Sequence, residues 1–246
     1  MKIHLHAWAM CQSMFCALPC PWQIWDEEAR PRVPAFLPLV GLVIGLLWAA
    51  LCWLTRRLAL PLPLQALVLA VYPWKVTGGM HLDGFLDVTD AAGSCRDLAR
   101  RREILKDSHV GAFAVVGCGM LMLAQLACFE AAAEKLPAVL LVLLPVVSRC
   151  CSSLAVLCLR PMAVSQYAGQ ARHKSWCSLP LAALALALLA GFGLCGRYGL
   201  ALLGVLAGYG WALRRGYRTL DGMNGDIAGY ALTIGELCGA AVCALL

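Results

Sequence analysis

The sequence predicts an all-α protein, a polytopic integral membrane bundle of about six or seven transmembrane helices. Of its 246 residues, 61% are hydrophobic and only 14% are charged, whereas soluble domains are about 45–50% apolar and about 25% charged. The apolar residues also fall in long uncharged blocks instead of the periodic stripes of amphipathic helices. Composition and block length together exclude an ordinary soluble domain.

Seven apolar blocks approach or reach the roughly 20 residues that a membrane-spanning helix needs. The second block carries Pro61 and Pro63 near its start, where a helix tolerates proline best. The fifth and sixth blocks are marginal in length, so the number of spans stays between six and seven. The blocks cover residues 34–54, 58–74, 110–129, 136–159, 179–196, 199–213 and 227–246. No repeat or linker divides them, which predicts a single transmembrane domain over residues 1–246.

Lysine and arginine are distributed unequally between the two sides that alternating spans define. Fifteen lie on the side of loop 75–109, and four lie on the other. The positive-inside rule makes the basic side cytoplasmic, so we expect loops 75–109 and 214–226 to face the cytoplasm. We expect the lipid bilayer as partner and no nucleic acid, because basic residues beside spans bind anionic headgroups. The sequence leaves a monomer and a homo-oligomer equally open.

Three carboxylates follow the second span. Asp83, Asp87 and Asp90 are spaced i, i+4, i+7, which places them on one face of a helix. Like charges on one stripe repel unless a cation lies between them, and Mg²⁺ prefers oxygen ligands of this kind. The alternative is an acidic, solvated turn beside the membrane, which leaves the neighbouring glycines and histidine unexplained. The spacing therefore predicts a Mg²⁺ site.

A basic cluster in the same loop suits phosphate chemistry. Arg96 and Arg100 are four residues apart and are expected to share a helical face. Arginine binds phosphate oxygens bidentately, although anchoring to the membrane explains these two residues equally well. Gly78 and Gly79 would let the backbone approach a phosphate closely. Carboxylates, a divalent ion and arginines together are the requirements of phosphoryl transfer.

Three polar residues near the carboxylates are catalytic or binding candidates. His81 is the best candidate for the general base, with a phosphate donor and a minor metal ligand as alternatives. Asp107 and Ser108 precede the third span and either cap its N-terminus or complete the site. In the second case Asp107 is catalytic and Ser108 binds substrate.

Charged residues inside apolar spans are costly and mark functional sites. Arg149 lies within the fourth span, where it binds a substrate phosphate or pairs with Glu236 or Glu130. Asn224 and Asp226 open the last span. Asp226 is either a ligand of the site or an acid stabilised by the helix dipole.

The motif resembles the cobalamin synthase family. Gly78-Gly79-x-His-x-Asp-Gly-x-x-Asp-x-x-Asp90, followed by 103–108 and Gly111, is similar to its signature, and the stretches 15–45, 147–149 and 222–237 agree. The resemblance implies a Mg²⁺-dependent enzyme of the bacterial inner membrane, an adenosylcobinamide-GDP ribazoletransferase. Such an enzyme joins adenosylcobinamide-GDP to α-ribazole or its 5'-phosphate, releasing GMP. The resemblance also implies that Asn224 and Asp226 bind substrate.

Two other functions are less consistent with the sequence. A CDP-alcohol phosphotransferase needs Asp-Gly-x₂-Ala-Arg, but Asp83-Gly84 is followed by Phe-Leu-Asp. An ion-coupled transporter would show inverted repeats and place its acids at mid-membrane. No such repeat is visible, and the acidic motif lies between the spans.

Overall fold

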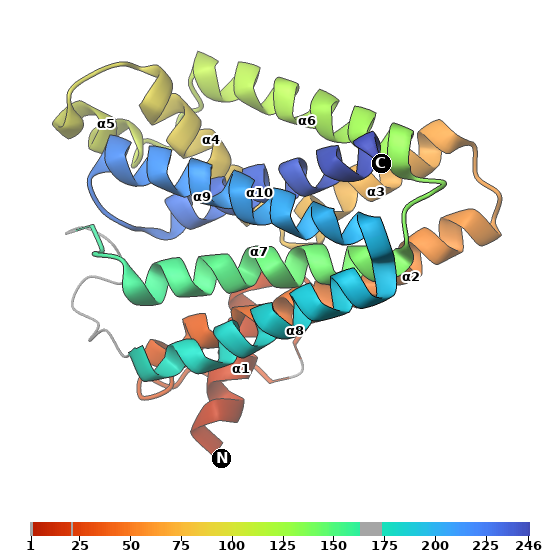
Figure 1. Ribbon diagram of the computed structural model, residues 1–246. Coiled ribbons are helices and arrows are strands. Elements are labelled where there is room, and N and C mark those ends of the chain that lie inside the picture. The colour runs from red at the N-terminus through yellow and green to blue at the C-terminus, as the bar shows by residue number, and fades with distance from the viewer. Residues whose placement is uncertain (1, 21, 163–173) are drawn as a thin grey trace.

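The computed structural model describes residues 2–20, 22–162 and 174–246, and this part of the chain is built from helices, as predicted (Figure 1). Three short 3₁₀ helices, η1 Arg30–Phe36, η2 Lys174–Cys177 and η3 Gly196–Gly199, accompany the α-helices. The α-helices are α1 Lys2–Phe15, α2 Leu37–Arg57, α3 Leu62–Val76, α4 Met80–Gly93, α5 Leu98–Ile104, α6 Ala112–Ala132, α7 Ala138–Cys158, α8 Ser178–Cys195, α9 Leu200–Leu220 and α10 Gly225–Leu245.

The helices α2, α3 and α6 to α10 coincide with the predicted apolar blocks. In the described residues, five stretches are long and apolar enough to cross a membrane, and one of them, Ser175–Leu220, contains both α8 and α9. The helix α3 is shorter, with 15 residues. The chain is therefore a multi-pass membrane protein, and the predicted all-α bundle is confirmed.

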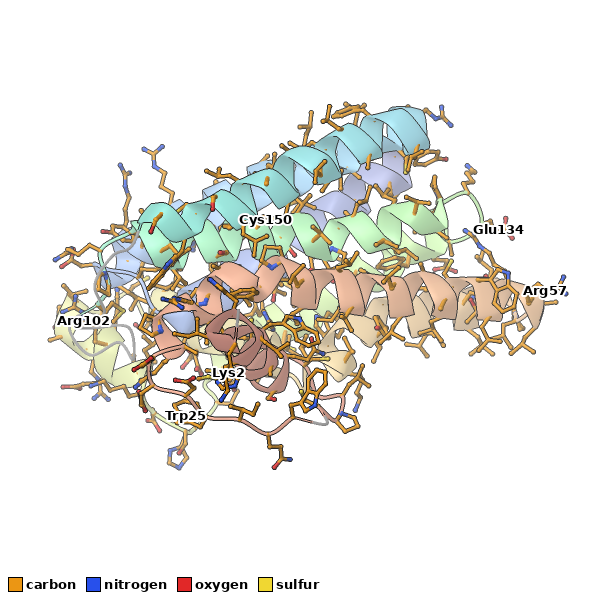
Figure 2. All side chains as sticks on the ribbon, turned by 90° about the horizontal axis from the view of Figure 1, so that it is seen from below. Lys2, Trp25, Arg57, Arg102, Glu134 and Cys150 are labelled. Atoms are coloured by element: carbon orange, nitrogen blue, oxygen red, sulfur yellow. The ribbon has the colours of Figure 1, made fainter. Side chains whose placement is uncertain are left out.

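Alternating helices separate the polar connections into two groups. Figure 2 shows Arg57 and Glu134 at one end of the bundle and Arg102 at the other. The second end also holds the start of α6 and the turn between α9 and α10 (Figure 1). Arg172, one of the fifteen basic residues of the predicted cytoplasmic side, lies outside the described residues.

The centre of the bundle is α7, which packs closely on α2 because α2 presents two glycines to it. A methyl group at Gly41 would lie 2.5 Å from the carbonyl oxygen of Pro145, and one at Gly45 would lie 2.5 Å from that of Val142. Small residues four apart allow membrane helices to approach this closely. The contact fixes the position of α7 against α2, and α7 carries Arg149.

Segment 75–109 was expected to connect two spans and to carry its three aspartates on one face of a helix, and the structure contains that helix. The segment contains α4 and α5, and α4 packs against α6 and α10 (Figure 1). Its apolar face, Phe85, Val88 and Ala91, is buried, and the Phe85 ring stacks on Tyr230 at 5.7 Å. Hydropathy detects only long apolar segments, so a short helix with one polar face escapes it.

The break between α3 and α4 depends on two glycines. Gly78 and Gly79 have φ angles of 64° and 81°, a left-handed conformation that only glycine adopts without strain. The N–H of Gly79 donates to the carbonyl of Trp74 at 2.8 Å and closes α3. The helix α4 begins at the next residue.

Candidate active site

The three carboxylates of α4 face a polar cavity of about 310 Å³. Asp83 is exposed, and Asp87 and Asp90 are half-buried. Because α4 is helical, their spacing puts all three on one face, as the sequence predicted. The opposite wall is the connection between α5 and α6. The cavity is lined by Asp83, Leu86, Asp87, Asp90, Ile104, Leu105, Lys106, Asp107, Ser108, His109, Val110, Gly111 and Ala114.

Asp90 is held against the backbone of Gly111. A methyl group at this glycine would lie 2.2 Å from both carboxylate oxygens of Asp90. No side chain fits in that space, so residue 111 must be glycine while Asp90 keeps its position. The glycine of the motif therefore fixes the last of the three carboxylates.

A fourth carboxylate reaches the cluster from α10. Asn224 caps α10 by accepting a hydrogen bond from the N–H of Ile227 at 2.9 Å, which satisfies a free donor of the first turn. The Asn224 side-chain amide donates to Asp226 at 2.6 Å. Asp226 lies close enough to Asp87 for its charge to raise the pKa of that carboxyl. Both candidates of the last span therefore lie at the carboxylate cluster.

Asp87 is the most perturbed member of this cluster. Burial, and then the negative charges of Asp83, Asp226 and Asp90, raise its pKa to about 7. Burial removes the water that stabilises the ionised form, and neighbouring like charges disfavour it further. A raised pKa in a polar cavity is typical of a functional site. Here it indicates negative charge that the protein itself does not neutralise.

The carboxylate cavity fits Mg²⁺. Its donors are carboxylate oxygens, the ligands that this ion prefers. Among the described residues, no three His, Cys, Asp or Glu side chains converge closely enough to hold a metal by themselves. Mg²⁺ usually keeps several waters and is bound by one or two carboxylates together with substrate phosphates. A dispersed set of acids with excess negative charge suits that mode of binding.

Asp107 and Ser108 line the cavity and do not cap α6. The N-cap of α6 is Gly111, which offers no side-chain hydrogen bond, so the capping alternative is wrong. Instead Asp107 accepts hydrogen bonds from the backbone N–H of His109 at 3.0 Å and from its ring at 2.7 Å. These bonds hold the pKa of Asp107 below its usual range, the backbone bond most strongly. Asp107 is therefore an ionised carboxylate on the cavity wall.

His81 lies on the other side of α4. Successive residues of a helix are about 100° apart, so His81 points away from Asp83, two positions later. It is buried, and its ring approaches Phe15 of α1 at 6.5 Å. Burial, and then the charge of Arg149, lower its pKa to about 3. This position does not fit the predicted role of general base in the carboxylate cavity.

Gly78 and Gly79 line a different cavity, of about 550 Å³, which is mostly apolar. It lies between α3, α4 and α6, with Trp74, Lys75 and Leu82 among its walls. The structure therefore does not bring these glycines to the carboxylates. What the structure shows is that Gly78 and Gly79 form the left-handed break after which α4 begins.

Arg96 and Arg100 are exposed and do not line the carboxylate cavity. The helix α5 begins at Leu98, so the expected common helical face is wrong, and Arg100 pairs with Glu103 at 2.7 Å. The basic residues on the cavity wall are instead Lys106 and His109. Their position on either side of Asp107 and Ser108 was a signal available in the sequence.

Arg149 pairs with Glu236, one of its two predicted ionic partners. The guanidinium donates to Glu236 and to Ser148 Oγ, and Ser148 Oγ donates to Glu236 at 2.8 Å. Arg149 and Glu236 are buried, 1% and 7% exposed. The pair links α7 to α10 and lies outside the carboxylate cavity.

Comparison with known proteins identifies the family of the chain. The cobalamin-5-phosphate synthase profile matches residues 7–244. Proteins named adenosylcobinamide-GDP ribazoletransferase are similar: that of Clostridium perfringens (strain SM101 / Type A) is 34% identical over 97% of both chains, and that of Clostridium botulinum (strain Alaska E43 / Type E3) is 29% identical over 94% of this chain and 93% of its own. No solved structure matches significantly. The chain therefore belongs to the cobalamin-5-phosphate synthase family.

Proposed function

We propose that this chain joins adenosylcobinamide-GDP to α-ribazole, or to its 5'-phosphate, in a Mg²⁺-dependent reaction that releases GMP. Membership of the family makes it a transferase of cobalamin biosynthesis. The names of the similar proteins support the two substrates. The observation that carries the proposal is the polar cavity lined by Asp83, Asp87 and Asp90 of α4, with Asp226 of α10 close enough to Asp87 for its charge to raise the pKa of that carboxyl.

The reaction exchanges one phosphorus–oxygen bond for another. A ribose hydroxyl oxygen of α-ribazole bonds to the phosphorus on the cobinamide side of the diphosphate. The bond from that phosphorus to the bridging oxygen breaks, and the bridging oxygen leaves with GMP. Bound Mg²⁺ would neutralise the charge of the diphosphate.

The residues of the cavity divide this work. Asp83, Asp87 and Asp90, with Asp226 beside them, would hold the ion. Asp107 is the predicted catalytic residue that lines the cavity, and as an ionised carboxylate it would accept the hydroxyl proton.

The proposed phosphate-binding residues lie on the cavity wall. Lys106 and His109 would bind the phosphate oxygens, with Ser108 as a neutral donor. They replace Arg96 and Arg100, which lie outside the cavity. The basic end of the bundle is proposed to face the cytoplasm of a bacterial cell, where nucleotide substrates are available.

An assay with membranes that contain the protein tests the proposal. Adenosylcobinamide-GDP, α-ribazole and Mg²⁺ should yield GMP and the joined cobalamin in equal amounts, and a chelator should stop the reaction. Asp87→Asn should abolish turnover. Asp97→Asn is the matched control, because Asp97 only caps α5 and asparagine caps as well. Turnover in chelator, or full activity of Asp87→Asn, would refute the metal-carboxylate site.

A second experiment tests the proposed phosphate contacts by comparing variants of Lys106 and Arg96. Lys106→Gln should raise the KM for adenosylcobinamide-GDP about tenfold, the loss expected for one charged contact. Arg96→Gln should leave it unchanged. The reverse ranking would restore the assignment made from the sequence.

A further inference from the structure

The helices α4 and α10 cross with almost no space between their backbones. A methyl group at Gly84 would lie 2.8 Å from the carbonyl oxygen of Asp226 and 2.9 Å from its Cα. One at Gly229 would lie 3.2 Å from the Cα and the carbonyl oxygen of His81. Thr233 Oγ1 donates to the same carbonyl at 3.3 Å. The pairs Gly84–Asp226 and His81–Gly229 show that the two helices run antiparallel here.

This crossing lies next to the carboxylates of α4. Gly84 is the neighbour of Asp83, and the residue seated on Gly84 is Asp226 itself. The charge of Asp226 acts on Asp87, and Asn224 orients the Asp226 carboxylate by a bond of 2.6 Å. The distance between the two backbones therefore sets the distance between the α10 acid and the α4 acids.

We infer that Gly84 is a positioning residue of the active site: having no side chain, it seats the first turn of α10 against α4 and so brings the Asp226 carboxylate to the three aspartates of α4. Gly229 supports the same crossing one turn farther along α10. The inference rests on the proposed function, because it assigns Asp226 to the metal site. It extends that function to two residues with no functional group.

The structure predicts a graded effect of added methyl groups. At Gly84 the obstacle is backbone at less than 3.0 Å, so α10 must move. At Gly229 the backbone lies at 3.2 Å, and a shift of a few tenths of an ångström is enough. Gly119 of α6 is the matched control, since an added methyl group there meets nothing within 4 Å.

Binding of Mn²⁺, followed by electron paramagnetic resonance on the purified protein, tests the inference without the reaction. Gly84→Ala should weaken Mn²⁺ binding about tenfold, the lower end of the effect of residues that orient metal ligands. Gly229→Ala should weaken it less, and Gly119→Ala should leave it unchanged. If Gly84→Ala does not fold, Gly229→Ala measured against Gly119→Ala carries the test.

A double-mutant cycle separates positioning from a general structural effect. Asp226→Asn removes the ligand that Gly84 is inferred to position, so adding Gly84→Ala to it should cause no further loss of Mn²⁺ affinity. Residues that act through one another are not additive, whereas independent ones are. Additive losses, or unchanged binding in Gly84→Ala, would overturn the inference. If Asp226→Asn and Asp87→Asn both bind Mn²⁺ like the parent protein, the metal site of the proposed function fails instead.

Discussion

The pKa of Asp87 reflects the burial of this residue and the charges around it. Half-buried among three other aspartates, it has a pKa raised to about 7 by burial and then by their charges. Near neutral pH, protons and a metal ion therefore compete for the Asp87 carboxylate. A divalent cation neutralises the same charges and must displace any proton bound there. The residue thus links the affinity for metal to pH.

The first prediction concerns this link. Mg²⁺ affinity should fall as the pH falls through 7, because protons then compete for the Asp87 carboxylate, and the loss between pH 7 and pH 6 should be about fivefold for one competing proton. The concentration of Mg²⁺ for half-maximal activity, measured at pH 6, 7 and 8, gives the result. A half-saturating concentration that is constant over this range would contradict the assignment of Asp87 to the metal site.

The second prediction concerns Gly111. Gly111→Ala places a methyl group on the Asp90 carboxylate, which is the mobile end of a side chain and turns away at little cost in stability. We expect unchanged unfolding in detergent and a loss of kcat/KM on the order of a hundredfold, since small displacements of catalytic groups have effects of that size. Gly119→Ala serves as control. Equal activity of the two variants would mean that the position of Asp90 is unimportant.

At the scale of elements, the Arg149–Glu236 pair joins the two central helices. Its charges are buried, and Ser148 bonds to both side chains. A buried charge is stable only with its partner, since water cannot replace it. The pair therefore fixes the register of α7 against α10, the helix that carries Asp226.

The third prediction follows from this pairing. Arg149→Met leaves Glu236 without a partner and should lower the free energy of unfolding by about 3–5 kcal/mol. Adding Glu236→Gln removes the second charge and should restore most of that loss. Denaturation in detergent measures both. Recovery of stability without activity would show that Arg149 also contacts substrate, and recovery of both would make it purely structural.

At the scale of the whole molecule, charge divides the bundle into two ends. Helix α5 and the turn after α9 share one end (Figure 1), where Arg102 lies, and Arg57 and Glu134 mark the other (Figure 2). By the positive-inside rule we expect the first end to face the cytoplasm. The orientation of the chain in the membrane therefore decides on which side of the membrane the active site lies.

The fourth prediction tests this orientation. In a cysteine-free variant of the protein, Leu98→Cys on α5 should react with an impermeant thiol reagent only after the cells are opened. Lys135→Cys, between α6 and α7, should react in intact cells. The opposite pattern would invert the topology and move the site to the outer face.

The sequence predicted the spans and the acidic face but not how they are assembled. Long apolar blocks located α6 and α7 to within a few residues, because burial in lipid demands such blocks. Hydropathy did not indicate how α4 packs, since its apolar face is short and is covered by protein. The approach of Asp226 to Asp83 was expected only from the family resemblance, because the packing of two distant helices cannot be inferred from local sequence pattern. The helical period alone, however, would have separated His81 from the carboxylates.

The crossing of α4 and α10 also has a consequence in time. The ribosome synthesises α4 before α10. The growing chain therefore carries the three aspartates of α4 before Asp226 is in place. If Asp226 belongs to the metal site, as proposed, that site is complete only after α10 has inserted and docked on Gly84. The proposed function then makes insertion of the last helix the step that completes the active site.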